Sequence, residues 1–228
     1  MNSAGRQSDL VFVHIPKTGG TSVRRALASS GRWDQTLLDY GQDAVETSGV
    51  VRAAMYATPQ ASLKTVLNPA SNMLLAGHFV ADKYVREFPA ADFVTFLRYP
   101  VNQVLSHFRH HVARLGFNGG LSEFCRNPSY RNLQTRHVGS VSLDRFSFVG
   151  ILECLALDIL TLSELAGTKL SLLHLNRLEV LPSIPITQKQ IAMIEESNAD
   201  DMALYASALA LRGRAGRMTR TELHGAGR

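Results

Sequence analysis

The sequence VFVHIPKTGGTSVRRA, residues 11–26, decides the fold because it passes from an apolar strand through a polar turn into an amphipathic helix. Residues 10–15 are rich in β-branched and aromatic side chains, which favour a strand, and Pro16 ends that run. The adjacent Gly19 and Gly20 accept backbone angles that other residues avoid. The stretch therefore predicts a buried strand and a sharp turn with bare backbone amides.

The helix after this turn is expected to start near residue 22 and to stop at Gly31. Apolar residues adopt helical spacing from Ser22 onward, and Thr21 or Ser22 is a suitable N-cap. A glycine turn that opens onto a helix N-terminus gathers unpaired N–H groups and the positive end of the helix dipole. Such a turn is therefore a candidate anion site.

Side chains in the turn favour a phosphate or sulfate ester as the ligand. Lys17 adds a positive charge, and three neighbouring hydroxyls add donors, which an ordinary strand-turn-helix corner would not require. The spacing is not that of a Walker A loop, GxxxxGK[ST], because Lys17 precedes an adjacent glycine pair. The candidate anion-binding residues are Lys17, Thr18, Gly19, Gly20, Thr21 and Ser22.

Length and composition indicate one globular domain. The chain has 228 residues, of which 45% are hydrophobic and 19% charged, and this suits a full-sized core. No window approaches the roughly 20 apolar residues of a membrane span, and the N-terminus has no apolar signal-peptide core. We therefore expect a soluble, cytoplasmic protein without stable membrane insertion. Cys125 and Cys154 are predicted to be buried free thiols.

The formal charge of +5 and the sequence pI of about 9.5 would suit a nucleic acid, an anionic membrane or an anionic substrate. Part of this charge lies in residues 212–228, where arginines stand among Gly, Ala and Thr without interleaved aromatic residues. We therefore expect a domain at 1–211, a basic solvated tail of low order at 212–228, and no nucleic-acid partner.

A second apolar run, residues 73–76, leads into Gly77, His78 and Phe79 and predicts a buried strand that ends at a cleft. Ligands of open α/β sheets bind at the carboxyl ends of strands, where the Lys17 turn is also expected. His78 is therefore a candidate general base, with a structural histidine as the alternative.

A third strand is predicted at residues 93–97, followed by Arg98 and by Pro100, which suits the first turn of a helix. Ser106 lies on the polar face of that helix. Arg98 at the strand end and Ser106 on the helix can together hold a second phosphate. Two separate anion sites fit a nucleotide that is phosphorylated at both ends.

The same helix carries three histidines that could be interpreted as metal ligands. His107, His110 and His111 have helical spacing, but no carboxylate or cysteine accompanies them. We therefore expect no metal.

The rest of the chain continues the alternation of strands and helices. The expected elements are short helices and loop at 33–72, a strand at 146–151, a helix at 154–165 opened by Glu153, a strand at 169–175, a helix capped by Thr187, and a helical run at 198–209. This order predicts an α/β fold with a mainly parallel central sheet.

Two motifs resemble those of sulfotransferases that use 3'-phosphoadenosine 5'-phosphosulfate (PAPS). HIPKTGGTS, residues 14–22, is similar to their 5'-phosphosulfate loop, and RxPxxxxxS, residues 98–106, is similar to their 3'-phosphate motif. The first motif resembles in particular the carbohydrate branch with the heparan and chondroitin enzymes. Weaker similarities are FVGILE at 148–153, NxQTR at 132–136 and NxxDxxLY at 198–205, so the likeness extends from residue 10 to about 211.

The resemblance implies a P-loop-like fold with three layers. It also implies PAPS as co-substrate, no metal, and transfer of the sulfuryl group to a hydroxyl of a carbohydrate or glycolipid acceptor, which the basic charge would suit if anionic. Animal members carry a membrane anchor that this chain lacks, so a bacterial member is expected. Within the NxQTR segment, Asn132, Gln134 and Arg136 become candidates for acceptor or cofactor contacts, a solvated helix face being the alternative.

Sulfuryl transfer needs positioning, a cation at the leaving phosphate and a base for the acceptor proton. The catalytic candidates are Lys17 for the charge and His78 for the base, since GHF resembles the Gly-His step of the uronyl 2-O and 6-O enzymes. His14 is the main rival for the base. One alternative is a P-loop nucleotide or sugar kinase-like phosphotransferase, which would need a Walker A loop and a Mg²⁺-holding aspartate, a role that Asp92 fits poorly. Another is a non-catalytic nucleotide-binding protein, which would have no use for a base.

Overall fold

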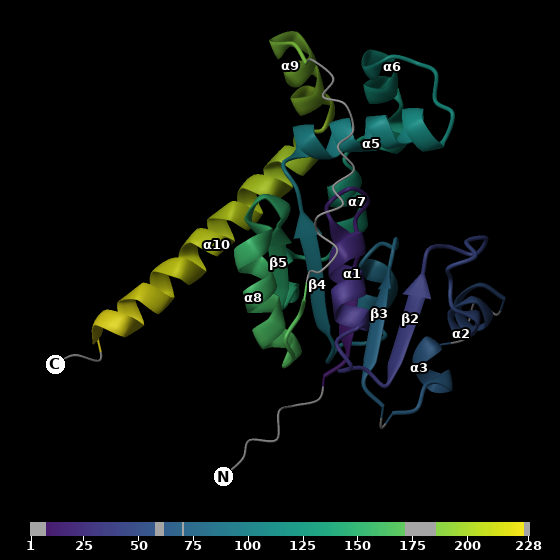
Figure 1. Ribbon diagram of the computed structural model, residues 1–228, viewed down its shortest axis with the longest axis vertical. Helices are drawn as coiled ribbons and strands as arrows, with labels where there is room; N and C mark the ends of the chain where they lie inside the picture. Colours follow the sequence, from purple (N-terminus) through teal and green to yellow (C-terminus); the bar gives the residue numbers. More distant parts are fainter. Residues whose placement is uncertain (1–7, 58–61, 70, 172–185, 226–228) are drawn as a thin grey trace.

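The computed structural model describes residues 8–57, 62–69, 71–171 and 186–225, with side chains in the last helix described as far as Gly213. The strands in these ranges form one sheet in the order β2-β3-β1-β4-β5, and all neighbouring strands are parallel. The arrows in Figure 1 accordingly point the same way. The strands are β1 (Leu10–Val13), β2 (Gln35–Asp39), β3 (Met73–Gly77), β4 (Asp92–Leu97) and β5 (Phe148–Ile151).

Helices follow the strands in alternation. They are α1 (Gly20–Ala28), α2 (Gly49–Arg52), α3 (Leu63–Val66), α4 (Asp82–Val85), α5 (Pro100–Arg114), α6 (Leu121–Arg126), α7 (Leu133–Val138), α8 (Leu155–Ala166), α9 (Gln188–Ser197) and α10 (Ala199–Gly225). Short turns of π or 3-10 helix are η1 (Ala53–Ala57), η2 (Pro128–Tyr130), η3 (Leu143–Arg145) and η4 (Leu152–Cys154).

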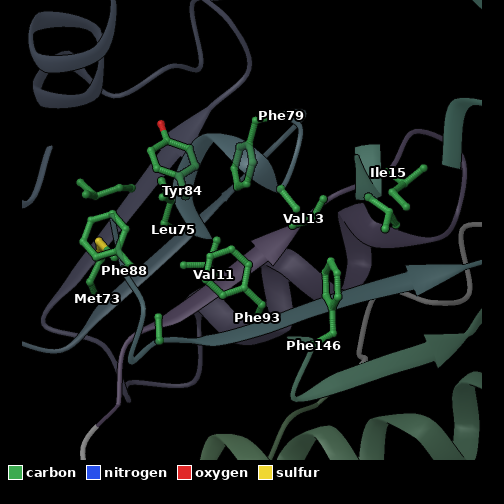
Figure 2. Packing of buried hydrophobic residues seen from close by; sticks show 14 of the residues in the cluster. Val11, Val13, Ile15, Met73, Leu75, Phe79, Tyr84, Phe88, Phe93 and Phe146 are labelled. Atoms are coloured by element: carbon green, nitrogen blue, oxygen red, sulfur yellow. The ribbon is translucent and has the colours of Figure 1, made fainter. Parts of the chain in front are cut away.

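The alternation of side chains along β1 divides the core into two layers. Val11 and Val13 belong to a cluster with residues of β3, β4, α4 and α10, part of which Figure 2 shows. Leu10 and Phe12 point to the other face, where α1 and α8 cover them. The helices therefore lie on both faces of a parallel sheet, which confirms the predicted α/β architecture with three layers.

The region 33–72 contains the predicted short helices α2, η1 and α3, but it also contains strand β2, which the prediction missed. Its sequence QTLLD alternates weakly, and β2 is at the edge of the sheet, where a strand needs less apolar surface. The buried carboxylate of Asp39 holds its end, because it accepts hydrogen bonds from Lys83 Nζ at 2.6 Å, Tyr56 Oη at 2.7 Å and Tyr84 Oη at 2.7 Å. Burial raises the pKa of Asp39, but these donors lower it below its usual value.

Helix α1 begins at Gly20, two residues before the expected start. Gly19, with φ of 82°, occupies the N-cap, so neither Thr21 nor Ser22 caps the helix. Helix α5 begins at Pro100, and Thr187 caps α9 through a capping box, both as predicted. Glu153 lies in η4, and the helix it was expected to open begins at Leu155.

Most of the strand predicted at 169–175 lies outside the described residues, and 169–171 form no strand. The helix α10 contains both the end of the predicted domain and most of the predicted tail, so the boundary at residue 211 stays a prediction. Both cysteines are free thiols, Cys125 buried and Cys154 half-buried. Within the described part of the chain, no helix combines the length and hydropathy needed to cross a bilayer.

Candidate active site

The turn between β1 and α1 is a left-handed loop at the carboxyl edge of the sheet. Lys17 and Gly19 have φ values of 68° and 82°, which reverse the chain so that α1 starts at Gly20. The hydroxyl of buried Thr18 donates to the carbonyl of Ile15 at 3.0 Å, so it braces the loop from within. Thr21 is exposed at the start of α1, where the first amides lack acceptors within the helix.

Packing requires both glycines, and the turn also requires Gly19, whose φ is 82°. A Cβ on Gly20 would overlap the imidazole of His14, and a Cβ on Gly19 would lie 2.5 Å from Leu152 Cδ1. The base of the loop is therefore pressed against neighbouring side chains. This contact places the N-terminus of α1 directly beside His14.

The predicted second anion site, at Arg98, is in direct contact with the first, at the Lys17 loop. Arg98 follows β4, and its Nη1 donates to the carbonyl oxygen of Lys17 at 3.1 Å. Gln103, buried on α5, donates through Nε2 to the carbonyl oxygen of Pro16 at 3.0 Å. Ser106 lies half-buried further along α5. The residues after β4 thus hold the Lys17 loop in position while keeping a guanidinium beside it.

Arg98 is itself held by Gln134 of α7. The amide of Gln134 accepts from the Arg98 backbone N–H at 2.8 Å and donates to its carbonyl at 2.9 Å. Burial lowers the pKa of Arg98, the charge of Glu153 opposes this, and the nearby Arg109 adds to it. Arg109, one turn after Ser106 on α5, is a second cation at this place that the sequence analysis did not select.

The other two predicted contact residues also bond within the protein. Asn132 donates through Nδ2 to Asp200 at 2.8 Å, and Arg136 donates to the carbonyl of Ser129 at 2.9 Å. The carboxylate of Asp201 accepts from the backbone N–H of Thr135 at 2.7 Å. The NxQTR segment at 132–136 and the NxxDxxLY segment at 198–205 are therefore hydrogen-bonded to each other. Contacts of Asn132, Gln134 and Arg136 to a ligand stay predictions.

Three histidines and a tyrosine gather beside the loop. The ring centroid of His78 lies 4.4 Å from that of His14, 4.7 Å from that of Tyr40 and 6.3 Å from that of His137. His14 Nδ1 and Tyr40 Oη are hydrogen-bonded at 3.2 Å. His14, Tyr40 and His78 directly follow β1, β2 and β3, whose ends the parallel sheet brings together, and His137 lies in α7.

His78 has a defined tautomer. Its Nδ1 bonds to the carbonyl oxygen of His14 at 2.5 Å, and a carbonyl only accepts, so Nδ1 carries the proton and Nε2 is the basic nitrogen. The residue as a whole is exposed, yet its ring is partly desolvated by its aromatic neighbours. Burial lowers the pKa of His78, the bond to His14 opposes this, and the charge of Arg24 adds to the lowering. A neutral imidazole with an available Nε2 can act as a general base.

Burial also lowers the pKa of the two neighbouring histidines. Burial, followed by the nearby His78 and Arg24, lowers the pKa of His14 well below its ordinary value. Burial lowers the pKa of His137 to about 4. Since His14 is almost fully enclosed while His78 is exposed, the geometry favours His78 over its rival as the base.

The sequence analysis missed Arg24, Tyr40 and His137. Tyr40 follows β2 directly and could be found only after that edge strand was recognised. His137 lies within the polar segment 130–139, but a single histidine in a polar segment gives no indication of a functional role. Arg24 is four residues after Gly20, and this helical spacing places both on the same face of α1.

The histidines of α5 form a pair. His107 Nε2 and His111 Nε2 are 3.0 Å apart, and burial, followed by the nearby His111, lowers the pKa of His107 to about 3. In the parts of the chain that the structure describes, no group of three or more His, Cys, Asp or Glu side chains is arranged to hold a metal ion.

The fold is shared with a sulfotransferase of known structure. A sulfotransferase from Alicyclobacillus acidocaldarius is similar over 88% of this chain and 95% of its own, with 16% sequence identity and a TM-score of 0.54. The mouse sulfotransferase SULT7A1, in a structure complexed with PAP, is similar over 87% of this chain and 67% of its own, with 12% identity and a TM-score of 0.47. No family model and no curated protein sequence matches the chain. The bacterial structure confirms the expected P-loop-like fold.

Proposed function

We propose that this protein is a PAPS-dependent sulfotransferase that transfers a sulfuryl group to a hydroxyl of a carbohydrate acceptor. The observation that carries the proposal is the hydrogen bond from Arg98 to the Lys17 carbonyl, because it joins two cationic sites beside an imidazole with a basic Nε2. A ligand with phosphate groups at two positions would engage both sites, and the exposed imidazole would face its reactive end.

The residues present fit such a co-substrate. Lys17 and the first amides of α1 would hold the 5'-phosphosulfate, and Arg98 with Ser106 would hold the 3'-phosphate. Bound PAPS would supply the sulfuryl group together with a phosphate leaving group. His78 Nε2 would accept the proton of the acceptor hydroxyl while the sulfuryl group passes to that oxygen and the 5'-phosphate departs as the leaving group. Lys17 stabilises the electron pair that remains on that phosphate.

The kinase-like alternative is less well supported. Asp92 stands at the start of β4, at the opposite edge of the sheet from the Lys17 loop, and its carboxylate accepts from Ser8 at 2.5 Å and from Ser147 at 2.7 Å. This aspartate therefore serves the fold and does not face the loop. A non-catalytic nucleotide-binding protein would not need the fixed tautomer of His78.

Isothermal titration of the desulfated product PAP, compared with AMP and ATP, tests the proposal. We expect PAP to bind far more tightly, and Arg98→Ala to weaken PAP binding by about tenfold or more, because it removes charge-assisted hydrogen bonds. Arg126→Ala, which removes an exposed arginine of α6, is the control and should leave the affinity unchanged. Equal affinity of wild-type protein for PAP and AMP would contradict the assignment.

A further inference from the structure

The two sides of the Lys17 loop carry separate sets of cations. On the side of β4, burial lowers the pKa of Arg98, and Arg98 also lies near enough to Glu153 and Arg109 that the first raises its pKa and the second lowers it. On the side of β3 and β2, burial has the largest effect on the pKa of His14, Tyr40 and His78, and the charge of Arg24 lowers all three values. The strand order places β1 between these two sides. Arg24 therefore stands beside the proposed base, on the side away from Arg98 and Arg109, while the charge of Lys17 also reaches His14.

The position of Arg24 follows from the packing of α1. Gly20 lies against the imidazole of His14, and Arg24 comes one turn later on the same helix face. Long side chains on a helix point back toward its N-terminus, which directs the guanidinium of Arg24 toward His14. Tyr40, bonded to His14 at 3.2 Å, brings a hydroxyl to the same place.

The guanidinium of Arg24 is incompletely satisfied within the protein. Its Nε is buried and has no hydrogen-bond partner among the described residues. The acidic residue whose charge reaches Tyr40 is Glu46, which is exposed, and the described ion pairs include none between Glu46 and Arg24. A half-buried guanidinium without a carboxylate partner is suited to an anionic ligand.

We propose that Arg24 and the Tyr40 hydroxyl form a subsite for an anionic group of the acceptor, a carboxylate or an ester sulfate close to the hydroxyl that reacts. The inference rests on the proposed function, and it names the substrate class as acidic saccharides. Arg24 serves here as a specificity-determining residue.

A pair of glycosides that differ only at C6, where one carries a carboxylate and the other a hydroxymethyl group, tests the subsite. 4-Nitrophenyl β-D-glucuronide and 4-nitrophenyl β-D-glucoside are titrated by NMR into the protein saturated with PAP. We expect the wild type to bind the glucuronide about tenfold more tightly, and Arg24→Gln to abolish this preference while leaving the glucoside and PAP affinities unchanged. Arg24→Lys should retain part of the preference. Arg25→Gln, at the exposed neighbouring position of α1, should retain all of it.

Each other outcome identifies what has failed. Equal binding of the two glycosides by the wild type, or binding of neither, overturns the subsite while PAP binding preserves the proposed function. A loss of affinity for both glycosides in Arg24→Gln also overturns it and assigns Arg24 a role that the acceptor charge does not govern. Failure of the wild type to bind PAP overturns the proposed function and this inference together.

Discussion

The two sides of the Lys17 loop are built by different physical means. On the side of β4, hydrogen bonds from Arg98 and Gln103 reach the loop carbonyls, and Gln134 holds the Arg98 backbone in turn. On the side of β3, aromatic rings pack around His78, with one bond to the backbone of His14. Hydrogen bonds with defined geometry fix positions, whereas ring packing with desolvation sets protonation. The first side is therefore suited to hold a charged ligand and the second to move a proton.

The contact shared by both sides gives the broadest expected effect, because it should change stability, nucleotide binding and turnover together. Gly20→Ala places a methyl group in the imidazole of His14, and overpacking of this kind costs about 1 to 3 kcal/mol of stability. Because the same shift displaces the N-terminus of α1 and the His14 carbonyl, nucleotide binding and turnover should both fall. Urea unfolding and PAP titration measure the two effects.

Gly49→Ala is the matched control, because Gly49 opens α2 with no neighbouring atom that a Cβ would meet. It should leave stability and PAP affinity close to those of the wild type. A Gly20→Ala protein with wild-type stability and turnover would show that the loop is not confined by His14.

The substitution His78→Ala distinguishes the role of the histidine side in turnover from the role of the Arg98 side in nucleotide binding. Loss of the base should lower turnover by about 10²- to 10⁴-fold while PAP affinity stays unchanged. The base acts in its neutral form and burial lowers its pKa, so the acidic limb of the wild-type rate profile should fall below the ordinary histidine value of 6.5. Rate profiles against pH, with saturating PAPS, check both expectations.

His14→Ala distinguishes the rival base. Full activity in His78→Ala, together with its loss in His14→Ala, would assign the base to His14 and leave the remaining site as proposed. An acidic limb above 6.5 in the wild type would contradict the desolvation of His78.

The smallest expected effect concerns Gln134, whose amide positions Arg98. Gln134→Ala removes both hydrogen bonds to the Arg98 backbone, and we expect PAP affinity to fall about threefold to tenfold with AMP affected less. Gln134→Glu keeps the acceptor but sets a buried carboxylate oxygen against the Arg98 carbonyl, so it should weaken PAP binding at least as much as Gln134→Ala. A variant that weakens PAP and AMP equally would show that Gln134 does not act through Arg98.

The parts of the site that lie within continuous motifs could be predicted from the sequence. Arg98 and His78 follow apolar strands directly, and Lys17 and Gly19 lie in the turn after another, so the parallel sheet brings all four to the carboxyl ends of its strands. The sequence pattern therefore predicts both the strand-turn conformation around each of these residues and their shared location at the carboxyl ends of the strands. The structure places Arg98 on the loop, as two cooperating anion sites require.

Residues whose location depends on tertiary pairing escaped prediction. Tyr40 reaches the site because β2 pairs with β3, and the pattern of QTLLD gives little indication of that strand. Gln134 has the polarity of a ligand-binding residue, yet its amide is buried against the backbone of Arg98. Polarity indicates that a side chain needs a partner but not whether the partner is a ligand or the protein.

The hydrogen bond from Arg98 to the Lys17 carbonyl has a thermodynamic consequence for the whole nucleotide. With the nucleotide bound as proposed, one guanidinium would serve both ends, so that occupancy of the 3'-phosphate position would change the freedom of the loop that receives the 5' end and would couple the two binding events energetically. The free energy for the bisphosphate should then exceed what its separate halves provide. Such reciprocity would let the protein discriminate against the abundant nucleotides that carry phosphate at one end.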